Sequence, residues 1–420
     1  MKRDSNMDNI NTMINLFKSG KSIVFWGAGN NNSYIIDALK RALCVPSAII
    51  DKDTNKQGKK FMGIQIMSYE EASSKVPNMY IWVSEGVWKY QIIGCLVHEL
   101  GFPMDRIINY EPVVMKRACQ FVESGFVYTA DAFQFCCTIS GRTLSPVIRT
   151  EDNAVEDIKR FLDLRRITSK NISKGIDKSC EGCIEIRTDY YAENPKISTI
   201  NYSPGGTCNL KCIYCISAAK ESKGTWDKDI DFKLIIDTLR NEGVLSDDLY
   251  FEISPGETAL NKNRKSYYKQ FCLAHGTKVM TNGTVYDEDL AECLQRREVN
   301  LLVSVDAGTK ETYKRIRGVD LYERLRINLL RYSKIAPGYV DLKYIFVPGE
   351  NDDKKDIEGF VNLCLEIKPG YIFITYDIFT SIQIAPQKTV EAVRYLISLL
   401  DEKQLLWKIN SEVLKNVVEK

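Results

Sequence analysis

The sequence lacks several features that would direct the protein to a membrane, to nucleic acid or to zinc. No apolar stretch approaches the length of a membrane span, and the polar start has no signal-peptide core. Basic and acidic residues nearly balance, at 57 and 55, without a long run of one sign, so no nucleic-acid or membrane-surface platform is indicated. Only two histidines occur, His98 and His275. These absences predict a cytoplasmic protein that binds neither nucleic acid nor membrane.

Cysteine, by contrast, is abundant. The chain has 13 cysteines, and in a reducing compartment clustered cysteines argue for metal binding or catalysis rather than disulfides. Five stand singly in apolar or helical surroundings and are expected to be buried structural thiols: Cys44, Cys95, Cys272, Cys293 and Cys364. Most of the others cluster as an adjacent pair, a C-x2-C and a C-x3-C-x2-C, namely Cys136 with Cys137, Cys180 with Cys183, and Cys208 with Cys212 and Cys215.

Alternating strand-like and helix-like segments predict an α/β fold. Residues 22–112 show the pattern of a parallel sheet, apart from a lysine-rich stretch at 51–61 expected to be a solvated loop. Residues 116–190 are irregular and cysteine-bearing around one helix at 151–167. Strand-like segments separated by helices then match a partly closed (β/α)6 barrel: 197–203, 248–254, 278–282, 300–306, 340–347 and 371–377. The tail from Thr389 has helical spacing and is expected to cap the barrel.

The three cysteines at 208–215 follow a predicted strand directly. They therefore lie at a strand's carboxyl end, where barrel active sites form. A structural zinc ion normally takes four protein ligands, and no nearby histidine or cysteine offers the fourth. Three cysteines can instead bind three irons of a 4Fe–4S cluster and leave one iron open to a small ligand. The spacing therefore indicates a 4Fe–4S cluster.

Residues 196–380 resemble the radical S-adenosylmethionine (SAM) enzymes. Besides the cysteine loop, the resemblance rests on strand-end motifs: SPGE at 254–257, TNG at 281–283, SVDAGTKETYKRIRG at 304–318 and VPGEND at 347–352. It implies that Tyr214 packs beside adenine and that Gly256 and Glu257 bind the methionine amine, although Ser254 and Pro255 replace the usual leading glycine.

The further contacts implied by the family are less direct. They are Asn282 in the third-strand motif, Ser304 and Asp306 near ribose or carboxylate, Arg317 near the carboxylate, and Val347 with Gly349 beside adenine. For Asp306 and Arg317 an ordinary surface ion pair is the alternative. The resemblance implies a 4Fe–4S cluster and SAM as cofactors and a reductase such as flavodoxin or ferredoxin as partner.

The second cysteine set spans residues 126–183. A strand, Cys136–Cys137, a loop, a helix and the C-x2-C of Cys180 and Cys183 resemble the SPASM or twitch auxiliary-cluster domain, which usually follows the barrel and here precedes it. The resemblance implies an auxiliary Fe–S cluster on Cys180, Cys183 and Cys136, with Cys137 or Cys119 as fourth ligand or with that position open. A zinc site and unliganded thiols are the alternatives.

The N-terminal segment GAGNNN, residues 27–32, resembles a dinucleotide fingerprint. Asp51 ends the second predicted strand, and Asn32 replaces the third glycine. The segment also resembles Rossmann-like domains attached to sugar acyltransferases and sugar C-methyltransferases. That likeness implies a sugar or sugar-nucleotide context, and a structural or partner-docking module without nucleotide is the alternative.

Together these features predict four domains. They are a Rossmann-like α/β domain at 1–115, a cysteine-rich auxiliary domain at 116–190, a radical SAM partial barrel at 191–385 and a C-terminal helical cap at 386–420. The predicted enzyme reductively cleaves SAM to a 5′-deoxyadenosyl radical that abstracts hydrogen from a sugar, nucleotide-linked or other small polar substrate. The alternatives are a peptide-modifying enzyme, a non-catalytic Fe–S redox sensor or scaffold, and a nicotinamide oxidoreductase using the GAGN loop. No side chain is singled out as acting on the substrate.

Overall fold

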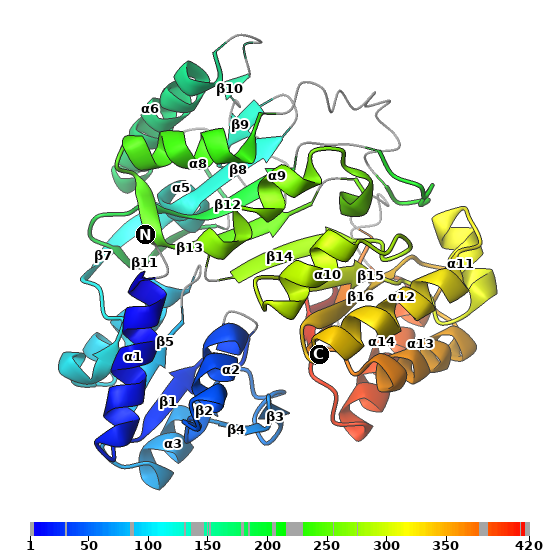
Figure 1. Cartoon of the computed structure of the whole chain (residues 1–420), viewed down its shortest axis with the longest axis horizontal. Helices are drawn as coiled ribbons and strands as arrows, with labels where there is room; N and C mark the ends of the chain where they lie inside the picture. Colours follow the sequence, from blue (N-terminus) through cyan, green and yellow to red (C-terminus); the bar gives the residue numbers. More distant parts are fainter. Residues whose placement is uncertain are drawn as a thin grey trace. The chain divides into compact units, whose positions relative to one another are not determined.

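The computed structural model of the chain describes residues 4–29, 32–84, 88–129, 132–135, 147–148, 150, 153–177, 180–183, 185–203, 207–215, 230–254, 256–274, 276–377, 385–411 and 413–415. They belong to two compact units (Figure 1). The first consists of Met1–Pro204, Asp227–Glu252 and Lys269–Thr277, and the second of Gly205–Trp226, Ile253–Tyr268 and Lys278–Lys420. Both are α/β with parallel strand pairs, as the sequence predicts.

The first unit begins with the predicted parallel sheet, in the strand order β3-β4-β2-β1-β5-β6. Its elements are α1 Asp4–Lys18, β1 Ile23–Trp26, α2 Ser33–Arg41, β2 Ala48–Ile50, β3 Lys60–Phe61, β4 Ile64–Met67, α3 Tyr69–Lys75, β5 Tyr80–Val83, α4 Lys89–Gly94, a π-helical turn Cys95–Glu99, a 3₁₀ turn Met104–Arg106 and β6 Ile107–Ile108. β1 and β2 are buried along their whole length, as expected for parallel strands. The expected solvated loop is confirmed for residues 51–59, whereas its last two residues form β3, which pairs antiparallel with β4.

The rest of the first unit is more regular than its sequence predicts. Its elements are β7 Val113–Cys119, α5 Gln120–Ser124, β8 Gly125–Thr129, β9 Ala132–Gln134, β10 Val147–Ile148, α6 Ala154–Ser173, β11 Ile186–Ala192, β12 Ile197–Ser203, α8 Phe232–Asn241, β13 Leu245–Ile253 and a 3₁₀ turn Phe271–Leu273. β7 and β11 pair antiparallel, and the other strands run in the order β10-β9-β8-β12-β13. Phe161 of α6 packs edge-on against Phe126 of β8.

The second unit alternates strands with helices. Its elements are a 3₁₀ turn Thr258–Leu260, α9 Arg264–Tyr268, β14 Gly276–Thr281, α10 Glu288–Gln295, β15 Asn300–Ser304, α11 Lys310–Arg317, α12 Tyr322–Ile335, β16 Val340–Phe346, α13 Lys354–Ile367, β17 Ile372–Tyr376, α14 Gln387–Glu402 and β18 Trp407–Ile409. β14 to β18 pair in parallel in chain order, and α12, α13 and α14 pack side by side (Figure 1). The predicted strands are confirmed to within a few residues, whereas the expected C-terminal helical cap also contains β18.

Side-chain caps fix the helices just beyond the strand ends. Asp287, Thr309 and Asp353 each accept a hydrogen bond from a backbone N–H in the first turn of α10, α11 and α13, which satisfies donors that a helix start leaves free. These caps hold the carboxyl-end loops of the second unit in place.

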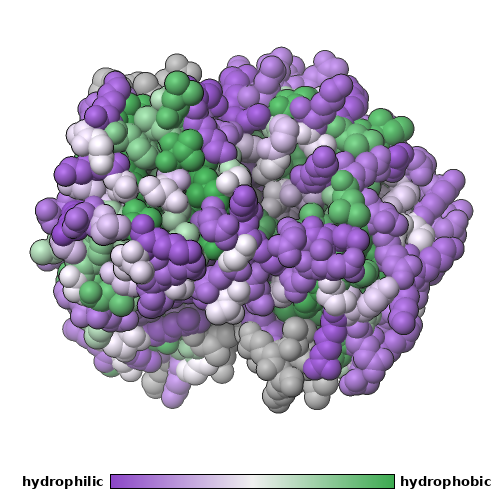
Figure 2. Space-filling view, turned by 90° about the horizontal axis from the view of Figure 1, so that it is seen from below, coloured by the Kyte–Doolittle hydropathy of each residue, from purple (hydrophilic) through white to green (hydrophobic). Residues whose placement is uncertain are grey.

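The exposed surface is mixed. Figure 2 shows one face, on which hydrophilic residues separate smaller hydrophobic patches. In the described part of the chain, no helix is long and apolar enough to cross a membrane.

Candidate active site

The cysteine loop of the second unit is docked on the end of α11. Lys211 N donates to Arg317 O at 2.9 Å and Ile213 N to Ile316 O at 3.0 Å. Gly318, which ends α11, has φ +74°, and a Cβ there would lie 2.9 Å from both the Cβ and the carbonyl oxygen of Lys211. Glycine is therefore required twice at this position, by the backbone angle and by the close approach of the loop.

Glu257 lies beside this loop as a completely buried carboxylate. It is 0% exposed, and its backbone N–H donates to Thr207 O at 3.0 Å, next to Cys208. The carboxylate accepts hydrogen bonds from Thr281 Oγ1 at 2.7 Å, Asn282 N at 2.6 Å and Ala259 N at 3.1 Å. No lysine, arginine or histidine among the described residues forms an ion pair with it. Burial raises the pKa of Glu257 more than these bonds lower it, so its net pKa is above 4.5.

Asp306, Arg317 and Tyr214 form a buried charged group. Asp306 is 0% and Arg317 3% exposed, so the alternative of a surface ion pair is wrong. Arg317 Nη2 lies 2.5 Å from Asp306 Oδ2, the Tyr214 hydroxyl donates to the same carboxylate, and the guanidinium faces the Tyr214 ring at 5.5 Å. Burial lowers the pKa of Arg317, but Asp306, Tyr214 and Cys212 together raise it well above the ordinary arginine value.

Arg317 also contacts the cysteine loop. Its Nη1 lies 3.2 Å from Cys212 Sγ and its Nη2 donates to Ser304 O. Its Nε is buried without a hydrogen-bond partner among the described residues. On the other side of the loop, Asn282 Nδ2 lies 3.6 Å from Cys208 Sγ and donates to Asn209 Oδ1 at 2.9 Å.

Asp306 is turned toward protein partners rather than into open space. It has φ +58°, a conformation rare outside glycine, and its Oδ1 accepts from Ile345 N at 2.7 Å. Asn351 links the backbones of Asp306 and Val347, because its Nδ2 donates to Asp306 O at 2.9 Å and its Oδ1 accepts from Val347 N at 2.8 Å. Sequence reasoning did not single out Asn209 or Asn351, although both lie inside the quoted motifs.

The remaining predicted cofactor residues frame this group. Val347 is buried at the end of β16, Ser304 is half-buried at the end of β15, and Gly256 is exposed beside Glu257. The structure thus brings the residues predicted around SAM to the carboxyl ends of β14, β15 and β16 and to the cysteine loop, all in one unit.

The comparisons with known proteins bear on this region. Residues 202–364 match the family model of the Radical SAM superfamily. The chain contains a radical SAM domain. This part of the chain is therefore similar to the radical SAM enzymes, whose cofactors are a 4Fe–4S cluster and SAM.

Individual relatives are more distant. An uncharacterized protein of Methanocaldococcus jannaschii, MJ0804, is 27% identical over 194 residues, covering 44% of this chain and 60% of the relative. Among solved structures, Streptococcus suis SuiB bound to the precursor peptide SuiA matches with a TM-score of 0.43 and 14% identity, over 66% of this chain and 59% of SuiB. A radical SAM methyltransferase from Sphaerobacter thermophilus matches with a TM-score of 0.36 and 14% identity, over 54% of this chain and 73% of that enzyme. The chain spans less than two thirds of MJ0804 and of SuiB.

The donor chemistry of the radical SAM domain fits an anionic thiolate cluster. Cys208, Cys212 and Cys215 supply three thiols on one loop, and two of the sulfurs face N–H donors, one of them cationic. Among the described residues, no three histidine, cysteine, aspartate or glutamate side chains are arranged to hold a metal ion directly. The fit therefore rests on the type and surroundings of the ligands.

A second group of thiols lies in the first unit. Cys183 N donates to Cys180 O at 3.1 Å, and Cys119 of β7 pairs with Ile186 of β11, three residues after Cys183. Burial, with Asp177, Cys119 and Cys183 nearby, raises the pKa of Cys180 to about 12. Cys136 and Cys137 lie outside the described residues. Of the five single cysteines, Cys44, Cys95, Cys293 and Cys364 are buried as predicted, whereas Cys272 is exposed.

The described backbone of the GAGN loop after β1 is hydrogen-bonded to nearby protein side chains. Ala28 N donates to Asp51 Oδ2 at 2.9 Å, and Lys56 Nζ lies 2.8 Å from the same oxygen. Asn32, in place of the third glycine, donates to Gly27 O at 2.6 Å and accepts from Trp82 Nε1 at 3.0 Å. A nucleotide bound in the usual way would have to displace the bond between Asp51 and Ala28, because it uses that acid and the loop amides.

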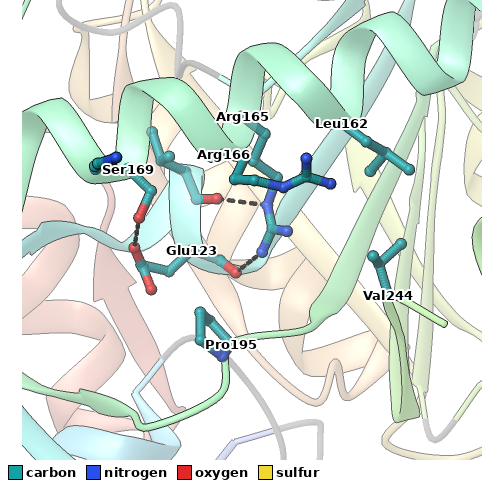
Figure 3. A pocket seen from close by; sticks show the side chains of 9 residues that line it. Glu123, Leu162, Arg165, Arg166, Ser169, Pro195 and Val244 are labelled. Atoms are coloured by element: carbon teal, nitrogen blue, oxygen red, sulfur yellow. Dashed lines mark hydrogen bonds between the residues drawn. The ribbon is translucent and has the colours of Figure 1, made fainter. Parts of the chain in front are cut away.

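Two cavities open in the first unit, and neither contains a predicted site residue. One, of about 310 Å³, lies between α5 and α6, where Glu123 accepts from Ser169 Oγ at 2.6 Å and Arg165 donates to the carbonyl oxygens of Val122 and Glu123 (Figure 3). The other, of about 500 Å³, is lined by polar residues that include Asn109, Glu111 and Asp248.

Proposed function

We propose that this radical SAM enzyme cleaves SAM reductively and removes a hydrogen atom from a small polar substrate. The observation that carries the proposal is a pair of buried, unmatched groups around the cysteine loop. Among the described residues, no cationic side chain pairs with the Glu257 carboxylate and no acceptor faces Arg317 Nε. The methionine part of SAM offers an ammonium for the Glu257 carboxylate and a carboxylate oxygen that can accept from Arg317 Nε, although Arg317 already pairs with Asp306 through Nη2.

Each residue then has a defined task. Cys208, Cys212 and Cys215 hold the 4Fe–4S cluster. Glu257 accepts three hydrogen bonds, and because a carboxylate offers about four acceptor positions, roughly one remains for the ammonium. Tyr214, Gly256, Asn282, Ser304 and Val347 line the rest of the SAM site. Asp306 orients Arg317 and Tyr214 and leaves the ribose to other groups.

When bound and reduced, the cluster held by Cys208, Cys212 and Cys215 would supply one electron for cleavage of the S–C5′ bond of SAM, and the resulting 5′-deoxyadenosyl radical would remove the substrate hydrogen. The protein binds, orients and excludes water. Its buried groups already point at fixed positions, so little reorganisation accompanies binding.

The proposal includes an auxiliary Fe–S cluster in the first unit. Cys180 and Cys183 form a turn with Cys119 close by, and Cys136 and Cys137 are the candidates for the remaining ligands. A flavodoxin- or ferredoxin-type reductase supplies electrons. Because thiols and Fe–S clusters persist in reducing compartments, we place the enzyme in the cytoplasm.

The substrate class rests on the N-terminal sheet. Its likeness to domains of sugar-modifying enzymes supports a sugar, a nucleotide-linked molecule or another small polar compound as substrate. Such a substrate would bind without displacing the hydrogen bond between Ala28 N and Asp51 in the GAGN loop. A peptide substrate, of the kind that SuiB binds in its complex with the precursor peptide SuiA, is the alternative. Transfer of deuterium from a labelled candidate substrate into 5′-deoxyadenosine separates the two.

The central test replaces all three loop cysteines by alanine. The triple variant of Cys208, Cys212 and Cys215 should lose about four irons per chain and all 5′-deoxyadenosine formation, while any auxiliary iron remains. Retained SAM cleavage would exclude the assigned cluster site. Wild-type protein that binds iron and SAM but forms no 5′-deoxyadenosine under reduction would instead support the redox sensor.

A further inference from the structure

Two of the three loop sulfurs receive contacts from outside the loop. Arg317 Nη1 lies 3.2 Å from Cys212 Sγ, and Asn282 Nδ2 lies 3.6 Å from Cys208 Sγ. Both distances lie within the range of N–H donation to sulfur, which is longer than to oxygen. The donors differ in one respect that matters, because Arg317 is cationic and Asn282 is neutral.

Arg317 is locked in place by bonds on its other side. Asp306 and the Ser304 carbonyl oxygen both hold Nη2, and the Tyr214 ring covers the guanidinium. Nη1 is thereby aimed at Cys212. With the side chain almost fully buried, water cannot replace this donor.

Asn282 is equally constrained. Its Oδ1 accepts from Thr284 N at 2.9 Å and Thr284 Oγ1 at 2.7 Å, and its backbone N donates to Glu257. These bonds fix the side-chain amide in one orientation, with Nδ2 shared between Asn209 Oδ1 and Cys208 Sγ.

We propose that Arg317 and Asn282 are positioning residues that set the reduction potential of the cluster by donating to its ligand sulfurs. The inference rests on the proposed function. Reduction adds one negative charge, part of which resides on the sulfurs, so N–H donors stabilise the reduced form more than the oxidised form and raise the potential. Arg317 has the larger effect because its donor is charged and buried. Asp306 moderates that effect by pairing with the guanidinium.

The measurement is the midpoint potential of the loop cluster, followed by EPR during a redox titration in enzyme lacking Cys180 and Cys183. The variants are Arg317→Lys, which keeps a cation for Asp306, Arg317→Gln combined with Asp306→Asn, which removes both charges, and Asn282→Ala. Arg315→Lys is the matched control, because Arg315 lies on the same helix but binds Glu350 at the surface.

Both Arg317 variants should lower the ratio of reduced to oxidised cluster at least tenfold at a fixed potential, which for one electron is about 59 mV. Asn282→Ala should shift the potential in the same direction by less, and Arg315→Lys should leave it unchanged. Iron content is measured beside each titration. If the Arg317 variants do not assemble a cluster, the shift of the midpoint potential in Asn282→Ala decides whether the inference holds.

The outcomes separate this inference from the proposed function. Wild-type protein without a cluster or SAM cleavage would overturn the proposed function. Wild-type cleavage together with unchanged potentials in the variants would overturn only the inference. Weakened SAM binding by the Arg317 variants at an unchanged potential would overturn it too, and would assign Arg317 to the SAM carboxylate alone.

Discussion

Replacing Glu257 by glutamine should weaken SAM binding roughly ten- to hundredfold. The carboxylate is fully buried and has no cationic side-chain partner among the described residues, so the SAM ammonium supplies the missing charge. A hydrogen bond to a charged group contributes about 1.5–3 kcal/mol, and each 1.4 kcal/mol is about tenfold in affinity. Glutamine keeps the volume and one acceptor oxygen, whereas alanine would leave three buried donors unsatisfied.

The pH dependence gives a second readout of the same residue. Burial raises the pKa of Glu257 above 4.5 in the cofactor-free protein, whereas a bound ammonium favours the ionised form. SAM affinity should therefore rise with pH through the folded pKa, by at most tenfold per pH unit for one proton. For folding the sign is opposite: the stability from this group is fully present below 4.5 and is lost as pH rises through the folded pKa. Both dependences should disappear in Glu257→Gln.

The assay is equilibrium SAM binding to cluster-loaded protein, with iron content as a check. Glu123→Gln is the control, because Glu123 of the first unit is also a buried carboxylate but already pairs with Lys116 at 2.7 Å. It should lower stability and leave SAM affinity nearly unchanged. If Glu257→Gln binds SAM as tightly as wild type, or keeps the pH dependence, the ammonium binds elsewhere and the reasoning fails.

Two further predictions concern the cysteine sites. Gly318→Ala should lower cluster loading, because its Cβ would lie 2.9 Å from Lys211. The control Gly338→Ala has φ +82° but open space around it, so it should lower only the stability, and both variants lose about 1 kcal/mol because of the positive φ. Equal iron contents in the two variants would show that the contact with Lys211 is unimportant. Replacing Cys180 and Cys183 by alanine should remove about half of roughly eight irons and reduce substrate conversion far more than 5′-deoxyadenosine formation. Metal analysis of wild type that finds about four irons and one zinc would make this centre a structural zinc site.

The strands β15, β16 and β17 of the second unit could be predicted from sequence because each is a mostly buried apolar run next to helical segments. β15 and β16, for example, are buried almost throughout, as in parallel sheets covered on both faces. Among the missed strands, β3 and β18 are two and three residues long, too short for a periodic pattern to mark them. In residues 116–190 the pairing of β7 with β11 joins segments far apart in the chain, which no local pattern reveals.

The sequence motifs named residues that the structure brings together, but not the partners of those residues. Motifs named Asp306 and Arg317, yet their mutual contact depends on the positive φ of Asp306 and on Ile345 N, which fixes the carboxylate from the neighbouring strand. The contact of Arg317 with Cys212 depends in turn on Gly318, which lets the loop approach the end of α11. These are tertiary constraints, and residue type alone does not express them.

The unmatched groups of the site also explain how the cofactor and the fold support one another. A buried donor without a partner costs about 1–3 kcal/mol, and Arg317 Nε is such a donor, while burial without a cation raises the pKa of Glu257. Replacing either group by an apolar one would stabilise the cofactor-free protein and weaken its affinity for SAM. If SAM binds as proposed, it satisfies both groups only in the folded state, so its binding free energy would add to the stability of the second unit. In the proposed SAM site, the buried Glu257 carboxylate and the open Arg317 Nε would therefore select a zwitterionic ligand next to the cysteine loop.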